Sequence, residues 1–284
     1  MTTTRARWTA AEETLLAVAA HRAPAAHGPH PWVLEARGHD VSVIERVEAR
    51  LPRHDRSGRD RLISCGAAVA NLRLAVRALG WSESWRHFPD PHRRDVVALV
   101  RAHRPLDPTP RDRALHAAIP LRRSHRGGFA GAPTAAERVE LLAANDAMGV
   151  AVVALDSLDA NLEHLLNHAV PRLSRDRSYR TELAAWTGST DIRAMSGLGG
   201  PNGGWRLVVI TTDDGPTDHL HAGVALQRTW LAATAAGLTA SVATQPLHVP
   251  EVRAGLIEAA ELPGFPQAIL RVGVPDRTRP SGKD

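Results

Sequence analysis

The densest group of chemistry-bearing side chains lies at residues 122–126, Arg-Arg-Ser-His-Arg, directly before two glycines. Arginine binds phosphate through two parallel hydrogen bonds, and a serine hydroxyl can add a short one. The same run could be a solvated basic loop, as most runs of charge are. The residue types therefore indicate an anion site and leave the solvated loop as the alternative.

Two stiff turns could bring backbone amides to a flat ligand. Residues 23–32, Ala-Pro-Ala-Ala-His-Gly-Pro-His-Pro-Trp, join a helix to a strand, and residues 243–246, Ala-Thr-Gln-Pro, follow a long helix. Either turn could also be a plain connection. His27 and His30 lack the spacing of a common metal site and no further ligands accompany them, so we expect no metal ion.

Cys65 is the single cysteine and stands near the start of a predicted helix, in Ser64-Cys65-Gly66. A helix N-terminus can lower a thiol pKa and make the thiol reactive, but a small buried side chain is the favoured interpretation. One cysteine excludes an internal disulfide and a cysteine-based metal cluster. The chain also contains no Ser-His-Asp order, no Rossmann glycine fingerprint and no P-loop.

The composition is typical of a folded cytoplasmic protein. Of the 284 residues, 43% are hydrophobic, no apolar run is long enough for a membrane span, and no secretory signal follows Met1. The formal net charge is +5, and Lys283 is the only lysine. No basic face with aromatics or reader motif accompanies this charge, so we expect phosphate recognition by a few arginines and no nucleic-acid partner.

The elements that must position these residues fall into two groups. In the first group, periodicity and turn residues predict helices at 10–22, with Thr9 as N-cap, and at 63–79, ending at Gly80, and strands at 32–35, 39–46, 81–87 and 95–101. In the second group they predict helices at 111–119, 133–148, 158–173, 179–186, 218–236 and 250–261, and strands at 150–155, 206–211 and 267–273. Residues 187–204 have the composition of a lid or loop.

A weak internal repeat connects the two groups. Residues 68–75 resemble residues 224–231, each within a long alanine-rich helix that ends at a glycine. The repeat predicts two related lobes, 1–104 and 111–275, joined by a proline-rich linker at 105–110 and followed by a tail at 276–284.

Taken in order, these segments resemble the nitroreductase family, and more closely its fused, single-chain (Acg-like) branch. Residues 23–32 resemble the family pattern Ala-Pro-Ser-x-x-Asn-x-Gln-Pro-Trp, and residues 121–126 resemble its Arg-Arg-Ser-x-Arg phosphate motif. The similarity continues at residues 63–72, 179–186, 223–237, 245–246 and 262–273, and covers about residues 10–275. The resemblance implies an α+β, nitroreductase-like fold whose two fused lobes form an intramolecular pseudo-dimer, so that the chain functions as a monomer.

The resemblance also implies a bound FMN and the residues that hold it. The phosphate and ribityl end would be held by Arg122, Ser124 and Arg126, with help from Arg271. The isoalloxazine ring would be contacted by Thr244, Gln245, Ala25, Ala26, Gly28 and His30.

Three ring positions depart from the family pattern. Ala25, Gly28 and His30 stand where the family has Ser, Asn and Gln, so three polar contacts are lost or changed, each worth about 0.5–1.5 kcal/mol. The lid at 187–204 is also short for the branch, which would leave the flavin more open to substrate.

The activity that the resemblance implies is that of an FMN-dependent oxidoreductase, using NAD(P)H or a small conjugated substrate at flavin N5. Two alternatives remain: a non-catalytic protein that binds or sequesters FMN, and a degenerate fold without flavin. No motif identifies the substrate or chooses between NADH and NADPH.

Overall fold

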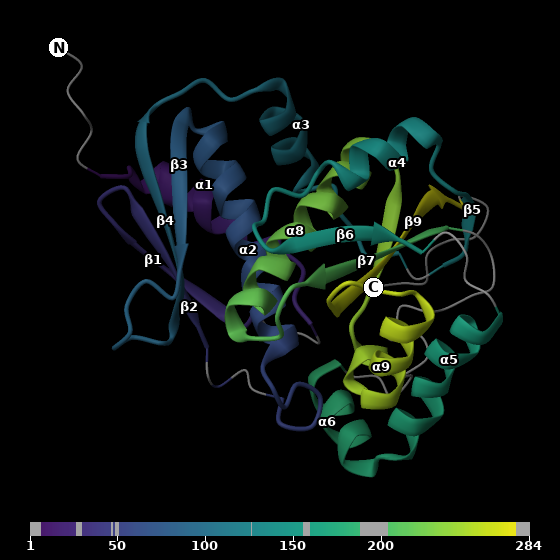
Figure 1. Ribbon diagram of the computed structural model, residues 1–284. Coiled ribbons are helices and arrows are strands. Elements are labelled where there is room, and N and C mark those ends of the chain that lie inside the picture. The colour runs from purple at the N-terminus through teal and green to yellow at the C-terminus, as the bar shows by residue number, and fades with distance from the viewer. Residues whose placement is uncertain are drawn as a thin grey trace.

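Two antiparallel sheets enclose a pair of long helices in the computed structural model (Figure 1). The structure describes residues 7–26, 30–46, 48, 51–125, 127–155, 160–187 and 204–276. None of the described helices is both long enough and apolar enough to cross a membrane.

The two sheets have the same strand order. The first runs β1 (Trp32–Arg37), β2 (Asp40–Glu45), β4 (Val96–Pro105), β3 (Trp81–His87). The second runs β6 (Val150–Ala154), β7 (Trp205–Thr211), β9 (Phe265–Pro275), β8 (Thr239–Ala243), and β5 (Phe129–Gly131) pairs with β9 beyond the end of β8. The pairings β1–β2, β2–β4 and β3–β4 match β6–β7, β7–β9 and β8–β9, and all are antiparallel.

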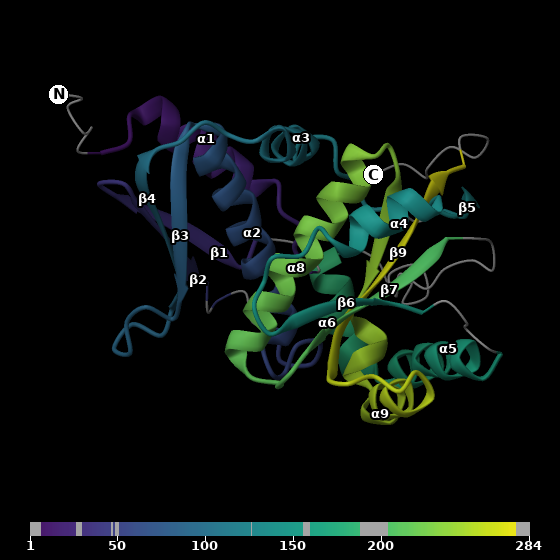
Figure 2. The same cartoon turned by 45° about the horizontal axis from the view of Figure 1, so that its top comes forward.

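The helices α2 (Arg59–Ala78) and α8 (Pro216–Ala235) lie between the sheets (Figure 2). They cross at Gly66 and Gly223, where a Cβ on either glycine would come within 2.0 Å of the Leu220 or Ile63 carbonyl oxygen. Only glycine permits this approach, so the two main chains touch. The apolar residues of α2 pack with strands of the first sheet and part of α8 in the largest core cluster, and those of α8 pack with strands of the second sheet in another.

Each residue of α2 has a counterpart 157 residues later in α8, from Arg59 with Pro216 to Ala78 with Ala235. A glycine is the N-cap of both helices, and Gly80 and Gly237, both at positive φ, follow their C-caps. The repeat noted in the sequence is therefore present, but the structure aligns it one residue further along, with residue 68 opposite 225.

Some of the remaining helices pack against the two long helices, and the others lie together beside the second sheet. They are α1 (Ala10–His21), α3 (Pro110–Ala118), α4 (Ala135–Leu142), α5 (Ala160–Arg175), α6 (Arg177–Thr187) and α9 (Pro250–Ala259), with a short 3₁₀ turn, η2 (Gln245–His248). Thr9, Thr109 and Thr134 each cap a helix with an acidic residue three positions on. Figure 1 shows α5, α6 and α9 together at the end of the second sheet.

Several predicted boundaries were wrong for local reasons. The helix predicted at 133–148 ends at Leu142, because Asn145 makes a turn: its side chain accepts from the Ala147 N–H and donates to the Val150 carbonyl. The helix predicted at 63–79 begins four residues earlier, and the short strands β5 and β8 were not predicted. Most of the predicted lid, residues 188–203, lies outside the described residues.

Candidate functional site

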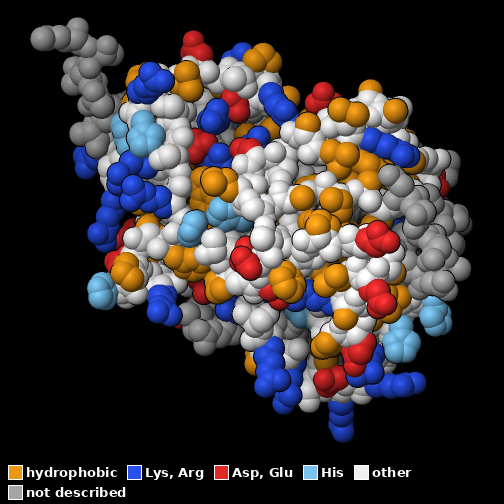
Figure 3. All heavy atoms as spheres, in the orientation of Figure 1, with side chains coloured by type: hydrophobic (Ala, Val, Ile, Leu, Met, Phe, Trp, Pro, Cys, Tyr) orange, Lys and Arg blue, Asp and Glu red, His pale blue; other side chains and the backbone are white. Residues whose placement is uncertain are grey.

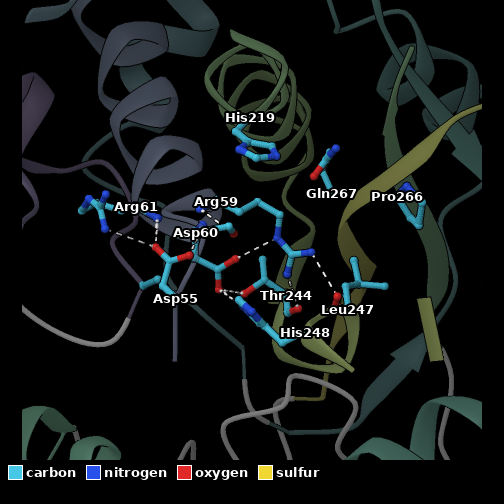
Figure 4. Close-up of polar contacts among 12 residues, drawn as sticks. Asp55, Arg59, Asp60, Arg61, His219, Thr244, Leu247, His248, Pro266 and Gln267 are labelled. Atoms are coloured by element: carbon cyan, nitrogen blue, oxygen red, sulfur yellow. Dashed lines mark hydrogen bonds and ion pairs between the residues drawn. The ribbon is translucent and has the colours of Figure 1, made fainter. Parts of the chain in front are cut away.

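The first turn of α2 meets the second lobe through a set of polar side chains (Figure 4). The Thr244 hydroxyl donates to Asp60 Oδ2 at 2.5 Å, and His248 Nε2 lies 2.9 Å from the same oxygen. Arg59 donates to the Thr244 carbonyl at 3.0 Å and to the Leu247 carbonyl at 3.1 Å. Two adjacent residues of α2 therefore hold the turn at residues 244–248, which follows β8 of the second sheet.

Asp60 is an ionised carboxylate within the protein, with 1% of its surface exposed. Burial by itself would raise the pKa of Asp60, but His248, Arg59 and the Thr244 hydroxyl outweigh burial and lower that pKa far below its ordinary range. The carboxylate is stable there because three partners share its charge, whereas an unpaired buried charge would be very costly.

Asp55, Asp60 and His248 have ligand-type atoms within 4.8 Å of one another. Asp55 accepts the main-chain N–H groups of Asp60 at 3.1 Å and Arg61 at 2.9 Å, and burial together with the charge of Asp60 raises its pKa. Protein donors contact these oxygens, so the three side chains form a buried hydrogen-bond network.

The next turn of α2 holds a second segment of the candidate site. Ser64 Oγ donates to the Asp60 carbonyl at 2.7 Å and accepts the Ala26 N–H at 3.1 Å. Ala25 is partly buried and packs against the first core cluster. The end of α2 thus brings residues 25–26 and 244–248, one segment from each lobe, to the same place.

Arg122 lies at the other end of the candidate site and also joins the lobes. Its Nη2 donates to the Arg22 carbonyl at 2.8 Å, and its guanidinium carbon lies 4.6 Å from the centre of the Trp230 ring. Burial, followed by the charges of Arg123 and Arg22, lowers the pKa of Arg122 to about 10. The side chain therefore stays protonated at neutral pH, as a cation surrounded by other cations.

Ser124 follows on the edge of the second sheet. It forms a parallel bridge with Ala240, and the next residue, His125, donates its N–H to the Ala240 carbonyl at 2.8 Å. Arg271 is buried one strand away, opposite Ser241, with its guanidinium carbon 5.2 Å from the centre of the Phe129 ring. The arginine–serine segment therefore meets β8 at Ala240, four residues before Thr244.

His30 lies near Arg122 and is packed by other rings. The centre of its imidazole lies 3.9 Å from that of His21 and 4.7 Å from that of Trp32. Burial, His21 and Arg122 lower the pKa of His30. An open groove of about 610 Å³ runs along this surface, and it is lined by Ala17, Val18, His21, Arg22 and His30.

We call the seam the region where residues 22–26, His30 and the start of α2 meet residues 122–124 and 244–248. The structure brings most of the predicted site residues together there, in two groups. Ala25, Ala26, Thr244 and Gln245 meet at the end of α2, and Arg122 approaches the segment that contains His30. Gly28 and Arg126 lie outside the described residues. Sequence reasoning did not identify Arg59, Asp60, Ser64, His248, Arg22 and Trp230.

Cys65 is fully buried, and its Sγ lies 3.7 Å from the Pro31 carbonyl oxygen. Burial raises the pKa of the Cys65 thiol, so the interpretation as a small buried side chain is confirmed and a reactive thiolate is wrong.

Charged side chains of both signs are interspersed on the face shown in Figure 3. No broad basic area dominates that face, although arginines supply nearly all the positive charge of the chain. The cations that matter for the candidate site are instead the few at the seam, around Arg122.

Comparison with known proteins gives clear relatives among curated sequences. The chain is 30% identical over 282 residues to a Mycobacterium tuberculosis protein with the provisional name NAD(P)H nitroreductase Rv3131, covering 89% of this chain and 82% of that one. It is 29% identical to a second M. tuberculosis protein, provisionally named NAD(P)H nitroreductase acg, covering 89% of this chain and 86% of the relative. No protein-family model matches the chain.

Solved structures with a similar shape include a BluB-like flavoprotein from Clostridium difficile 630, at 15% identity and a TM-score of 0.45, covering 60% of this chain and 94% of that one. Another is a nitroreductase with bound FMN from Bacteroides fragilis, at 16% identity and a TM-score of 0.41, covering 60% of this chain and 92% of that one. The sequence relatives, not these structures, determine the family.

Proposed function

The chain belongs to the nitroreductase family, and from this premise we propose that it is an FMN-dependent oxidoreductase that uses NAD(P)H to reduce a small conjugated or electron-poor substrate. FMN would lie at the seam between the lobes, with its phosphate near Arg122 and its isoalloxazine ring near Thr244. The substrate class, the hydride donor and the residues assigned to FMN come from the family resemblance, and the contacts of Arg122 and of the 244–248 turn support that placement.

The surroundings of the Arg122 guanidinium are the observation that carries the proposal. Its guanidinium packs over Trp230, its neighbours Arg22 and Arg123 are also cationic, and its buried Nε has no hydrogen-bond partner within the described part of the chain. A buried donor without an acceptor is costly, and phosphate oxygens are its natural partners. The residues present therefore fit a phosphate group.

The spacing of residues along β8 fits the remainder of FMN, its ribityl chain and its ring. Ser124 lies beside Ala240 near the start of this strand, and Thr244 directly follows its end. Four residues of strand extend about 13 Å, which leaves room for the ribityl chain between a phosphate at Ser124 and a ring at Thr244. Arg271, one strand away, would support the phosphate end.

Bound FMN would supply hydride transfer, which no side chain can perform alone. The protein would bind the phosphate through Arg122, Ser124 and Arg126. It would bind and orient the ring through Thr244 and Gln245 from one lobe and through residues 25–30 from the other. Neutral His30 would take the place of the family's glutamine.

The matching sheets and helices support an internal pseudo-dimer. The strand order, the pairings, the glycine crossing and the spacing of 157 residues all repeat between the two lobes. We infer that the chain contains the equivalent of two nitroreductase subunits and acts as a monomer, and that the arginine–serine segment gives it one FMN site.

The test is FMN binding by purified protein and by a paired variant. Replacing Arg122 and Ser124 together by alanine should weaken FMN binding about 100-fold, because charge-assisted hydrogen bonds are lost. Arg123→Ala is the comparison variant: within the described residues this exposed arginine donates to the carbonyls of Pro120 and Arg122, so removing it should weaken FMN binding much less. Equal affinity in wild type and the double variant would contradict the proposed phosphate position.

A flavin-binding protein without turnover is the second candidate. Ala25 stands where the family has serine, and the His30 ring packs between His21 and Trp32, so the ring contacts are reduced. Anaerobic addition of NADPH to the yellow protein separates the two: bleaching of the flavin band supports the oxidoreductase, and an unchanged band supports storage. A colourless protein that does not bind added FMN would overturn both.

A further inference from the structure

The turn at residues 244–248 is bound to α2 more extensively than a surface turn requires. The side chain of Thr244 and its carbonyl both bond to α2, to Asp60 at 2.5 Å and to Arg59 at 3.0 Å (Figure 4). Arg59 also bonds the Leu247 carbonyl, and His248 bonds Asp60. Both ends of the turn are thereby fixed to the other lobe.

These contacts are rigid because they are buried and charged. Arg59 and Asp60 are 4% and 1% exposed, and Arg59 Nε lies 3.3 Å from Asp60 Oδ1. Hydrogen bonds to ionised groups are short and about twice as strong as neutral ones. The backbone of Thr244 is therefore held at a defined position, which is what a turn that orients a ligand needs.

We propose that Asp60, together with Arg59, is a positioning residue for the isoalloxazine ring, acting through Thr244 and the 244–248 turn. The inference rests on the proposed function, since it presumes that the ring lies against this turn. It assigns to the first lobe a role in ring binding that does not involve touching the ring.

The equivalent end of α8 supports this role by contrast. The counterparts of Arg59 and Asp60 are Pro216 and Thr217, and the start of α8 has a different charged network. There Asp214 bonds Arg253, His219 and Gln267, all from the same half of the chain as α8. The Arg59 and Asp60 pair instead bonds the 244–248 turn of the other half, which fits a task that belongs to the candidate FMN site.

Four substitutions in the full chain separate positioning from general destabilisation. Thr244→Val removes only the hydroxyl and keeps the shape, and Thr244→Ser restores the hydroxyl. Asp60→Asn removes the charge that holds the turn. Asp55→Asn is the matched control, because it removes a neighbouring buried carboxylate whose hydrogen bonds go to the main chain of α2.

Dissociation constants for FMN and for riboflavin are the readout, together with the visible circular dichroism of the bound flavin. We expect Thr244→Val and Asp60→Asn each to weaken both ligands about tenfold, as loss of one buried hydrogen bond implies, and to change the dichroism. Thr244→Ser should bind both ligands like wild type, and Asp55→Asn should have dissociation constants within about threefold of the wild-type values. The double variant Asp60→Asn with Thr244→Val should bind no more weakly than Asp60→Asn alone, because both changes break the same contact.

Riboflavin separates this inference from the proposed function. It lacks the phosphate, so the Arg122 and Ser124 variant should lose FMN affinity and keep riboflavin affinity, whereas the Thr244 and Asp60 variants should lose both. Wild-type protein that binds neither ligand would contradict the proposed function. Wild-type binding with unchanged affinity in Thr244→Val, or equal losses in Asp55→Asn and Asp60→Asn, would overturn the positioning role alone.

Discussion

The N-terminal ends of α2 and α8 occupy equivalent places in the two lobes and are built differently. At the α8 end, His221 fills the space between segments: its Nε2 lies 3.1 Å from His87 Nδ1, and its Nδ1 lies 3.1 Å from the Met148 carbonyl. The Trp85 ring is 4.8 Å from the His221 ring, centre to centre. Large rings from both lobes therefore contact each other directly.

At the α2 end, the counterpart of His221 is Ser64 and the counterpart of His87 is Thr244. Both have small side chains, and both bind main-chain or carboxylate groups of the seam rather than each other. We infer that the repeated fold offers two equivalent places, and that the small side chains at the α2 end leave room there for a ligand. Arg122 would supply the phosphate partner at that end.

The largest expected effect tests whether the two helices are equivalent at all. Gly66→Ala and Gly223→Ala should each destabilise the protein by about 3 kcal/mol or more, since the added methyl meets a main-chain carbonyl that cannot move away. Urea unfolding measures the effect.

Gly80→Ala and Gly237→Ala are the controls for this pair. Both glycines have positive φ and no atom within 4 Å of the place that an added methyl would occupy, so each should cost only about 1–2 kcal/mol of backbone strain. If Gly66 tolerates alanine and Gly223 does not, the crossing is not symmetric and the comparison fails.

A smaller effect distinguishes the two helix ends by function. Ser64→Ala and His221→Ala should each lower stability by about 1 kcal/mol through lost hydrogen bonds. Ser64→Ala should also weaken FMN binding several-fold, because the Ala26 N–H loses its partner, whereas His221→Ala should leave it unchanged. Flavin fluorescence titration measures the FMN affinity of each variant. If the two substitutions weaken FMN binding equally, the two helix ends do not differ in function.

The smallest expected effect is on the pH dependence of stability. Burial, His87 and Arg73 lower the pKa of His221 below its ordinary 6.5, although Met148 opposes them. Below about pH 6.5 the unfolded chain binds this proton more readily than the fold, so stability falls as the pH drops. At the N-terminal end of α2, the pKa of Asp60 is lowered. The contribution of Asp60 to folding stability therefore persists down to about pH 4, where the carboxyl group of the unfolded chain becomes protonated.

His221→Gln should therefore flatten part of the decline in unfolding free energy between pH 7.5 and 5.5, by less than about 1 kcal/mol. Only part is expected, because His30, His116 and His219 have lowered pKa values as well. A decline as steep in His221→Gln as in wild type would show that the proton uptake occurs elsewhere.

Local patterns in the sequence predicted the long elements well. The helix of α1 with its Thr9 cap, the glycines that end α2 and α8, and most strands follow from periodicity and capping, which act within a few residues. The predicted helix at 133–148 was wrong because a single side chain, Asn145, bonds its own turn and outweighs helix propensity.

The candidate site was only partly predictable, for a physical reason. The arginine–serine run and the two turns have recognisable compositions, so they were identified as possible ligand contacts. Asp60 bonds to Thr244, 184 residues away in the sequence, and Arg122 stacks on Trp230 from a distant helix. Contacts of this kind are created by the packing of α2 against α8, and no local pattern indicates them.

We propose that the chain has one FMN site, at the seam beside α2. Titration of the flavin-free protein with FMN, followed by quenching of flavin fluorescence, measures the number of sites directly. We expect saturation at one FMN per chain, with the affinity lost when Arg122 and Ser124 are both replaced by alanine. Saturation at two per chain, or no saturable binding, would contradict the account.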